Sequence, residues 1–380
     1  MAQPRRSVPL ILDVDTGIDD SLALLYACAS PEAEIVAVTC SAGNVDARQV
    51  AENTRGVLEL AGRPDVEVAV GREAPLLREL VTTPETHGPR GIGWAELPPP
   101  VMPLSPRRSP ELIVEEARRR PGEITLVTLA PLTNVAIAAL REPELPRLLR
   151  RLVIMGGAYR VPGNTTPVSE WNVHVDPDAA RIVFGAWARA VEADMAAGRG
   201  ETAGTGVART SAEDVQRASW GNASPTAPRA LAIGLDVTEQ ARLLPRHLGA
   251  LADRAGTAAP ALEARVRSGD APPAENPVLR YLADALRFYM EFHATSDHFY
   301  GAFTHDPFVV AAALDDRLVR TEPVAVDVET GGAISTGQTV ADWRHLWGRP
   351  ANADVAVEGD ADAFLERLVD RVGALAARRG

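Results

Sequence analysis

VPLILDVDTGIDDSLALLYACA, residues 8–29, brings four aspartates to the junction between an expected strand and an expected helix. Residues 8–14 form a short apolar run rich in β-branched side chains, which is typical of a strand buried on both faces. Thr16-Gly17 interrupts this run, and residues 21–29 have the apolar spacing of a helix. The stretch therefore predicts a strand, a tight turn and a helix, with the acidic side chains gathered at the turn.

The acidic residues of this stretch are Asp13, Asp15, Asp19 and Asp20. A single aspartate at a helix start is ordinary, because a carboxylate suits the positive end of the helix dipole. A whole cluster of carboxylates would repel strongly unless something neutralised it. A hard divalent cation with oxygen ligands would do so, and both Ca²⁺ and Mg²⁺ qualify. The cluster is therefore interpreted as a metal site.

Strand-like and helix-like segments alternate along the rest of the chain, which is typical of a parallel sheet with helices on both faces. Further strands are expected at 34–40, 66–71, 124–129, 151–155 and 231–236, with closing edge strands at 322–329 and 354–358. The expected helices after the first are 46–61, 109–120, one that follows 130–134 and ends near Arg141, 177–190, 248–267, 277–295, 308–314 and 360–378. We predict a single α/β domain over residues 1–380, with a Rossmann-like, mostly parallel (mixed) central sheet of about eight strands flanked by helices.

Two polar segments, 15–20 and 41–44, each follow an expected strand. Ligands bind beyond the carboxyl ends of the strands in such sheets, so we expect these segments to face each other. Residues 192–228 are different, because Gly, Ala, Thr and Ser predominate there without any periodicity. This segment is predicted to be a disordered insertion.

The composition excludes several classes of protein. The formal net charge is −12 and all 39 basic residues are arginine, which argues against a nucleic-acid or anionic-membrane surface and excludes Schiff-base lysine chemistry. Cys28 and Cys40 lie in apolar segments and are expected to be buried free thiols. The sequence has no signal-peptide pattern and no run long enough to span a membrane, so a cytoplasmic enzyme is expected.

Short motifs follow one another along the chain: DVDTGIDD at 13–20, SAGN at 41–44, LAPLTN at 129–134, MGG at 155–157, GNTTPVSEWN at 163–172 and HDP at 305–307. In this order and spacing the chain resembles the nucleoside hydrolases, which cleave the N-glycosidic bond of ribonucleosides to give ribose and a free base. The resemblance runs from about Val8 to the C-terminus. It implies a role in purine or pyrimidine salvage and a homodimer or homotetramer.

The resemblance implies one tightly bound Ca²⁺. Its ligands would be the carboxylates of Asp15, Asp20 and Asp306 and the main-chain oxygen of Leu129. Family members often have Thr at the last position, but every residue offers a main-chain oxygen.

The resemblance also implies contacts to the ribonucleoside. Asp19, Asn44 and Asn172 would hold the 2′ and 3′ hydroxyls. The other implied substrate contacts are Asn164 and Glu170 at the 5′ hydroxyl and Met155 against the sugar. Trp171 is expected to pack below the sugar, and His87 is expected on a loop near the site. Tyr289 could line the base pocket. His293, His298 and Tyr300 could also line the base pocket, and which of these residues contacts the base stays open.

Cleavage of an N-glycosidic bond passes through an oxocarbenium-like sugar, so carboxylates around the ribose favour the transition state. Asp15 is expected to act as the general base on a water that Ca²⁺ orients. His305 is the candidate acid for the leaving base, since an imidazole titrates near neutral pH. In the family a His at this position marks members that favour inosine and uridine.

Two other functions remain open from the sequence. A catalytically inactive Ca²⁺-dependent protein that binds ribonucleoside or ribose would keep the same residues. A haloacid dehalogenase-like phosphatase would also place an Asp-Val-Asp-Thr motif after a buried strand, but it needs a residue that holds phosphate and a later acidic pair for Mg²⁺.

Overall fold

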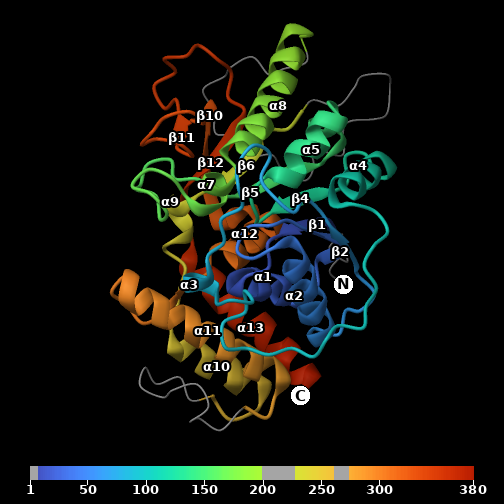
Figure 1. Ribbon diagram of the computed structural model, residues 1–380, viewed down its shortest axis with the longest axis vertical. Coiled ribbons are helices and arrows are strands. Elements are labelled where there is room, and N and C mark those ends of the chain that lie inside the picture. Colours follow the sequence, from blue (N-terminus) through green and yellow to red (C-terminus); the bar gives the residue numbers. More distant parts are fainter. Residues whose placement is uncertain (1–6, 199–226, 261–273) are drawn as a thin grey trace, which may run out of the picture.

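An eight-stranded sheet runs through the molecule in the order β3-β2-β1-β4-β5-β6-β12-β9 (Figure 1). Every neighbouring pair is parallel except the last, in which β9 runs antiparallel to β12. The strands are β1 (Val8–Val14), β2 (Ala33–Cys40), β3 (Glu67–Val70), β4 (Thr125–Thr128), β5 (Arg151–Met155), β6 (Ala230–Ile233), β9 (Val319–Val324) and β12 (Ala353–Gly359). This is a computed structural model, and it describes residues 7–198, 227–260 and 274–380. It confirms the predicted α/β domain with a mixed, mostly parallel sheet.

Helices cover both faces of the sheet, which explains why the strands read as continuous apolar runs. Leu10, Leu12 and Val14 of β1 point to one face, and Ile11 points to the other. The first face packs against α1 (Ile18–Ala29), α2 (Ala47–Leu60), α10 (Pro245–Ala255), α11 (Pro277–Ser296), α12 (His305–Leu314) and α13 (Ala361–Arg379). The second face packs against α4 (Ser109–Arg119), α5 (Thr133–Arg141), α6 (Leu145–Leu148) and α8 (Pro177–Ala196).

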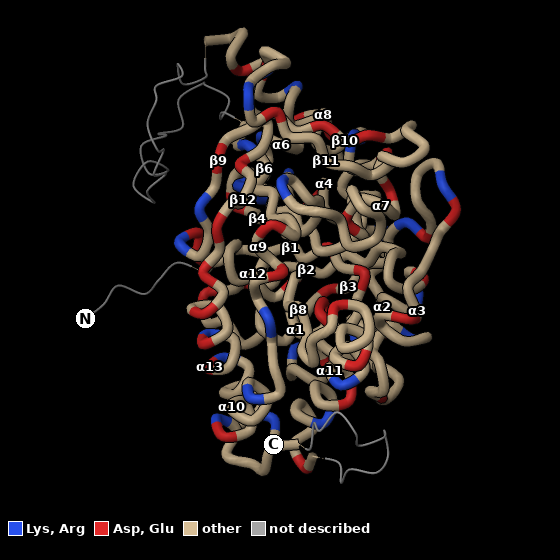
Figure 2. The backbone as a smooth tube through the Cα atoms, turned by 90° about the vertical axis from the view of Figure 1, so that its left-hand side faces the viewer, with Lys and Arg blue, Asp and Glu red and all other residues tan. Residues whose placement is uncertain are grey.

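Short elements complete the fold around the carboxyl ends of the strands. They are α3 (Pro84–His87), α7 (Trp171–Val175), α9 (Leu235–Thr238), a 3-10 turn (Asp316–Leu318), and the two small antiparallel pairs β7 (Arg242–Leu243) with β8 (Ala302–Phe303) and β10 (Val326–Val328) with β11 (Thr339–Ala341). Arginines and acidic residues are interspersed along the outer helices and loops (Figure 2). Within the described residues, no helix has the length and apolar character needed to cross a bilayer.

Helix α1 begins at Ile18, earlier than the predicted start at residue 21, because Asp20 caps the turn that precedes it. The backbone N–H of Gly17 donates to Oδ2 of Asp20 at 2.9 Å. One of the clustered aspartates therefore also stabilises the start of the helix.

Several predicted boundaries were wrong. Helix α8 extends to Ala196 instead of ending near residue 190, and α10 ends at Ala255 instead of continuing to residue 267. Gly256 adopts a left-handed conformation (φ +68°) that ends α10. The segment 322–329 is divided between β9 and β10. Strand β12 is not an edge strand, because it lies between β6 and β9 in the sheet. Most of the predicted insertion, residues 199–226, lies outside the described residues.

Candidate active site

The first polar segments lie at the carboxyl ends of β1 and β2, which end side by side because Val14 pairs with Cys40. The backbone N–H of Asn44 donates to Oδ2 of Asp15 at 2.8 Å, and Nδ2 of Asn44 donates to Oδ2 of Asp20 at 3.3 Å. The two segments therefore face each other, as the strand order predicts.

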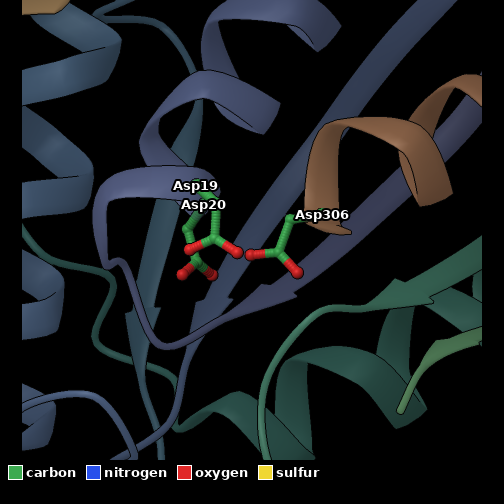
Figure 3. A group of neighbouring side chains, drawn as sticks. All are labelled: Asp19, Asp20 and Asp306. Atoms are coloured by element: carbon green, nitrogen blue, oxygen red, sulfur yellow. The ribbon is translucent and has the colours of Figure 1, made fainter. Parts of the chain in front are cut away.

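Three buried carboxyl groups converge at this end of the sheet: Asp19 and Asp20 from the start of α1, and Asp306 from the first turn of α12 (Figure 3). One oxygen from each lies within 4.8 Å of the others. Asp20 is 0% exposed and Asp306 is 3% exposed. The fold thus brings together acidic residues from the two ends of the chain. We call Asp19, Asp20 and Asp306 the acidic trio.

Burial and mutual repulsion both disfavour full ionisation of these groups. Burial raises the pKa of Asp20 to about 6. Burial, followed by the charges of Asp19 and Asp20, raises the pKa of Asp306 well above its usual range, and the Asp20 and Asp306 carboxyls share a hydrogen bond. Burial and the Asp20 charge do the same for the pKa of Asp19. The trio is therefore neutralised either by protons or by a cation.

The ligand atoms fit a hard divalent cation. Besides the trio, Oδ1 of Asp15 and Oδ1 of Asn44 are buried and have no hydrogen-bond partner among the described residues. Buried oxygens without partners are costly unless a ligand satisfies them. An all-oxygen set of carboxylates and an amide is the donor chemistry that Ca²⁺ and Mg²⁺ prefer.

Asp15, which the prediction made a ligand of the metal, lies beside the acidic trio. Its backbone N–H donates to Oδ1 of Asp20 at 3.2 Å. Burial, then the charges of Asp20 and Asp19, raises the pKa of Asp15 well above its usual value. A proton-accepting role needs the deprotonated form, which a bound cation would favour.

Asp13 is set apart from the trio. Its Oδ1 accepts hydrogen bonds from Thr39 at 2.6 Å and from Nδ2 of Asn134 at 2.9 Å. Burial, partly offset by these two bonds, raises the pKa of Asp13 to about 7. Asn134 also donates to the main-chain oxygen of Cys40, so the Asp13–Asn134 contact ties β1, β2 and α5 together below the site.

The predicted main-chain ligand, Leu129, lies at the end of β4 and is buried. Its carbonyl oxygen accepts a hydrogen bond from Nδ2 of Asn172 at 2.7 Å. The same Nδ2 lies 3.4 Å from Sδ of Met155. Leu129, Asn172 and Met155 are therefore grouped at the carboxyl ends of β4 and β5. The carbonyl oxygen keeps a second lone pair for another contact.

Glu170 positions Asn172 by capping α7. Its carboxylate accepts hydrogen bonds from the backbone N–H groups of Asn172 (2.8 Å), Gly157 (2.9 Å) and Val173 (3.1 Å). Burial raises its pKa despite these bonds. The structure thus gives Glu170 a role in holding the loop, besides the contact to the 5′ hydroxyl that remains a prediction.

Asn164 and Trp171 are less buried than the other predicted substrate contacts. Asn164 is exposed, and its Oδ1 accepts from the backbone N–H of Trp171 at 3.0 Å. Trp171 is partly buried, and its Nε1 has no partner among the described residues. These two residues border the site on the 163–172 loop, and their contacts to substrate remain predictions.

Two histidines flank the acidic groups. Nδ1 of His87 accepts from the backbone N–H of Ile18 at 3.1 Å and lies 4.0 Å from Oδ1 of Asp19. Nδ1 of His305 lies 2.8 Å from the hydroxyl of Thr238. Burial lowers the pKa of both histidines to about 3, so both rings are neutral at pH 7 and the His87–Asp19 contact is no ion pair.

No role was predicted from the sequence for three residues that support the site: Gly43, Thr238 and Asn134. A Cβ atom on Gly43 would lie 2.1 Å from Oδ2 of Asp15, so only glycine lets the chain approach so closely. Thr238 holds His305 but lies in a segment with no recognised motif. Asn134 was quoted within the LAPLTN motif, and its contact with Asp13 gives that motif a structural reason.

Known proteins resemble this chain over nearly its whole length. A family model described as inosine-uridine preferring nucleoside hydrolase matches residues 10–366. The pyrimidine-specific ribonucleoside hydrolase RihA of Salmonella gallinarum is 33% identical over 367 residues, covering 96% of this chain and 98% of RihA. RihA of Klebsiella pneumoniae subsp. pneumoniae is 33% identical over the same length.

Solved structures give the same result. A purine-preferring ribonucleoside hydrolase from Gardnerella vaginalis has a TM-score of 0.77 and 28% identity, covering 97% of this chain and 99% of that chain. The plant nucleoside hydrolase PpNRh1 has a TM-score of 0.76 and 27% identity, covering 98% of this chain and 100% of that chain. With the family model spanning nearly its whole length, the chain belongs to the nucleoside hydrolase family and is a hydrolase that acts on ribonucleosides.

Proposed function

We propose that the protein hydrolyses the N-glycosidic bond of ribonucleosides at the acidic trio, with Ca²⁺ as its cofactor and water as the nucleophile. The observation that carries this proposal is the convergence of Asp19, Asp20 and Asp306 beside Asp15 at the carboxyl end of the sheet. The family membership supports the reaction, and the oxygen-only ligand set supports a hard cation.

The residues that would hold Ca²⁺ are Asp15, Asp20, Asp306 and the main-chain oxygen of Leu129. Asp19, the third member of the trio, lies close enough to Asp20 and Asp306 to share this role, besides its proposed contact with the ribose diol. When bound, the cation would neutralise the carboxylates, orient the vicinal hydroxyls and position one water.

The sugar would lie between the acidic trio and the wall formed by Asn172 and Met155. Asp19, Asn44 and Asn172 would bind the 2′ and 3′ hydroxyls, and Asn164 and Glu170 would bind the 5′ hydroxyl. Positive charge develops on the ribose as the C1′–N bond breaks, and the surrounding carboxylates would stabilise it.

The remaining chemistry is proton transfer. Asp15 would accept a proton from the water that attacks C1′. His305 is neutral because burial lowers its pKa to about 3, so we propose that it acts through a hydrogen bond from Nε2 to the leaving base. The Thr238 hydroxyl on Nδ1 would fix the tautomer that carries the proton on Nε2. This modifies the expectation of an imidazole that titrates near neutral pH.

The preferred base is inferred from His305 and from the named relatives. RihA is named as pyrimidine-specific, whereas the Gardnerella vaginalis hydrolase is named as purine-preferring. The resemblance at His305 and the higher identity to RihA favour a pyrimidine-leaning or broad inosine–uridine enzyme. The homodimer or homotetramer, the cytoplasmic location and the role in salvage stay predictions.

The direct test is release of reducing sugar from inosine, uridine, cytidine, adenosine and guanosine in the presence of Ca²⁺. We expect ribose and free base from at least uridine or inosine. A protein that binds these nucleosides without releasing sugar would instead be the inactive binding protein. Release of phosphate from p-nitrophenyl phosphate, without sugar release, would favour the phosphatase, which the family match already opposes.

His305→Ala is expected to lower kcat/KM for inosine by roughly 10²-fold or more, because general acid or donor groups contribute 10²- to 10⁴-fold. p-Nitrophenyl riboside should lose little, since its leaving group needs no proton. The matched control is His345→Asn, at an exposed position with φ +55° that Asn tolerates. Equal losses on both substrates would remove His305 from this role.

A further inference from the structure

A buried histidine beyond the acidic trio has one ring nitrogen without a hydrogen-bond partner among the described residues. His293 lies on α11 and is 4% exposed. Its Nδ1 is 2.8 Å from Oδ2 of Asp297, one helical turn further along. Its Nε2 is buried and has no hydrogen-bond partner in the part of the chain that the structure describes. An unpaired buried polar atom calls for an explanation, and a bound ligand is one.

The ring of His293 stands between the two histidines of the active site. It contacts Tyr289 at a centroid distance of 4.4 Å, and Tyr289 lies 5.3 Å from His87. On its other side it contacts Phe303 at 4.9 Å, and Phe303 lies 5.5 Å from His305. These five rings form a continuous aromatic wall from His87 to His305. An aromatic wall with a buried polar atom that lacks a partner is suited to a nucleobase, which offers both a ring face and hydrogen-bonding edges.

Asp297 decides which kind of hydrogen bond His293 can make. Partial burial acts to raise the pKa of Asp297, but hydrogen bonds from Ser296 and His293 outweigh it and hold the pKa below its usual value. Burial lowers the pKa of His293, although Asp297 opposes this shift. The pair is therefore a carboxylate and a neutral imidazole whose Nδ1–H donates to Asp297. Nε2 then carries a lone pair and is an acceptor.

We infer that His293 is a specificity-determining residue whose Nε2 accepts a hydrogen bond from a ring N–H of the nucleobase, with Asp297 as the positioning residue that fixes its tautomer. The matching ligand chemistry is a lactam or imide N–H, as in uracil or hypoxanthine. A base without that hydrogen would leave Nε2 unpaired, which is the condition under which polar sites discriminate strongly. The inference rests on the proposed hydrolysis. It adds that the protein recognises the edge of the nucleobase that carries the ring N–H.

The test compares five substrates that share the ribose: uridine, N3-methyluridine, inosine, 1-methylinosine and p-nitrophenyl riboside. His293→Phe keeps an aromatic ring but removes Nε2, whereas His293→Gln offers an amide oxygen as a substitute acceptor. Phe292→Leu is the matched control, because Phe292 is the chain neighbour and packs on the His293 ring at 5.2 Å. The readout is kcat/KM for each variant with Ca²⁺ present, and the melting temperature reports folding.

The native protein is expected to prefer uridine, inosine or both over the methylated analogues. His293→Phe should lower kcat/KM for the preferred N–H base by roughly 10- to 100-fold and narrow the ratio of this kcat/KM to that for the methylated analogue. The loss on p-nitrophenyl riboside should be much smaller. His293→Gln should recover part of the loss, and Asp297→Ala should give the same substrate pattern with a smaller loss. The comparison of uridine and inosine, each with its methylated analogue, shows which base donates the hydrogen bond to Nε2.

Equal losses on all five substrates, including p-nitrophenyl riboside, would assign His293 a structural role and overturn the inference. Unchanged kcat/KM for uridine and inosine in His293→Phe would overturn it as well. If that variant does not fold, the losses of kcat/KM in His293→Gln and Asp297→Ala on the same five substrates decide between the two outcomes. Failure of the proposed function is distinct, because the native protein would then release sugar from none of the five.

Discussion

Asp15→Asn is expected to lower kcat for ribonucleosides by roughly 10³- to 10⁴-fold, because the proposed general base and one carboxylate beside the cation are lost together. The amide keeps the size of the side chain and an oxygen that can accept from the backbone N–H of Asn44, as Oδ2 of Asp15 does at 2.8 Å. It also removes one charge from a buried acidic group, so the fold is expected to persist.

The measurement is release of reducing sugar at saturating substrate and saturating Ca²⁺. Asp46→Asn is the matched control, because Asp46 is an exposed cap of α2 whose Oδ1 accepts from two backbone N–H groups, and asparagine caps equally well. A near-normal kcat for Asp15→Asn would contradict its assignment as the base.

Calcium is expected to raise the melting temperature much more at about pH 7.5 than at about pH 5.5. Burial raises the pKa of Asp20 to about 6 and that of Asp13 to about 7, both above the value of 3.8 for a free aspartate. The native state therefore binds more protons than the unfolded state between about pH 4 and 7. The stability of the metal-free protein is complete below this window and falls as the pH rises through it. A cation bound at the acidic trio would replace the proton that Asp20 loses, but not that of Asp13, and it binds only the deprotonated groups.

The measurement is the melting temperature at both pH values, in chelator and in excess Ca²⁺. At a Ca²⁺ concentration about 100 times its Kd, the expected stabilisation is about 2.7 kcal/mol. Asp306→Asn should lose this response and should melt at a higher temperature than native protein in chelator at about pH 7.5, because one repelling charge is gone.

Asp370→Asn is the control for this experiment. Asp370 lies on α13, away from the site, where its half-exposed side chain pairs with Arg254 of α10. It should respond to Ca²⁺ as the native protein does. An equal calcium response at both pH values, or a native response in Asp306→Asn, would contradict this account.

The fold was largely predictable because its signals are local. The β1–α1 unit combines a β-branched run, a Thr-Gly break and helical spacing, and each of these acts within a few residues. The boundaries that failed depend on tertiary context. Helix α10 stops at Gly256, which offered no stronger signal than other glycines, and β9 and β10 separate only because they join different sheets.

The site was only partly predictable for the same reason. The strand order explains why Asn44 meets Asp15, but no periodicity links Asp306 to Asp20, and only the resemblance joined these residues before the structure did. Burial depends on the whole fold, so neither the low pKa of His305 nor the unsatisfied Nε2 of His293 follows from the order of the residues.

We propose that acidic side chains from both ends of the chain share one calcium ion at the carboxyl end of the sheet. A crystal structure of the protein grown with Ca²⁺ tests it most directly. We expect one ion in contact with the carboxylates of Asp20 and Asp306 and with that of Asp15. No ion between these residues, with the Asp306 side chain turned away from Asp20, would contradict the account.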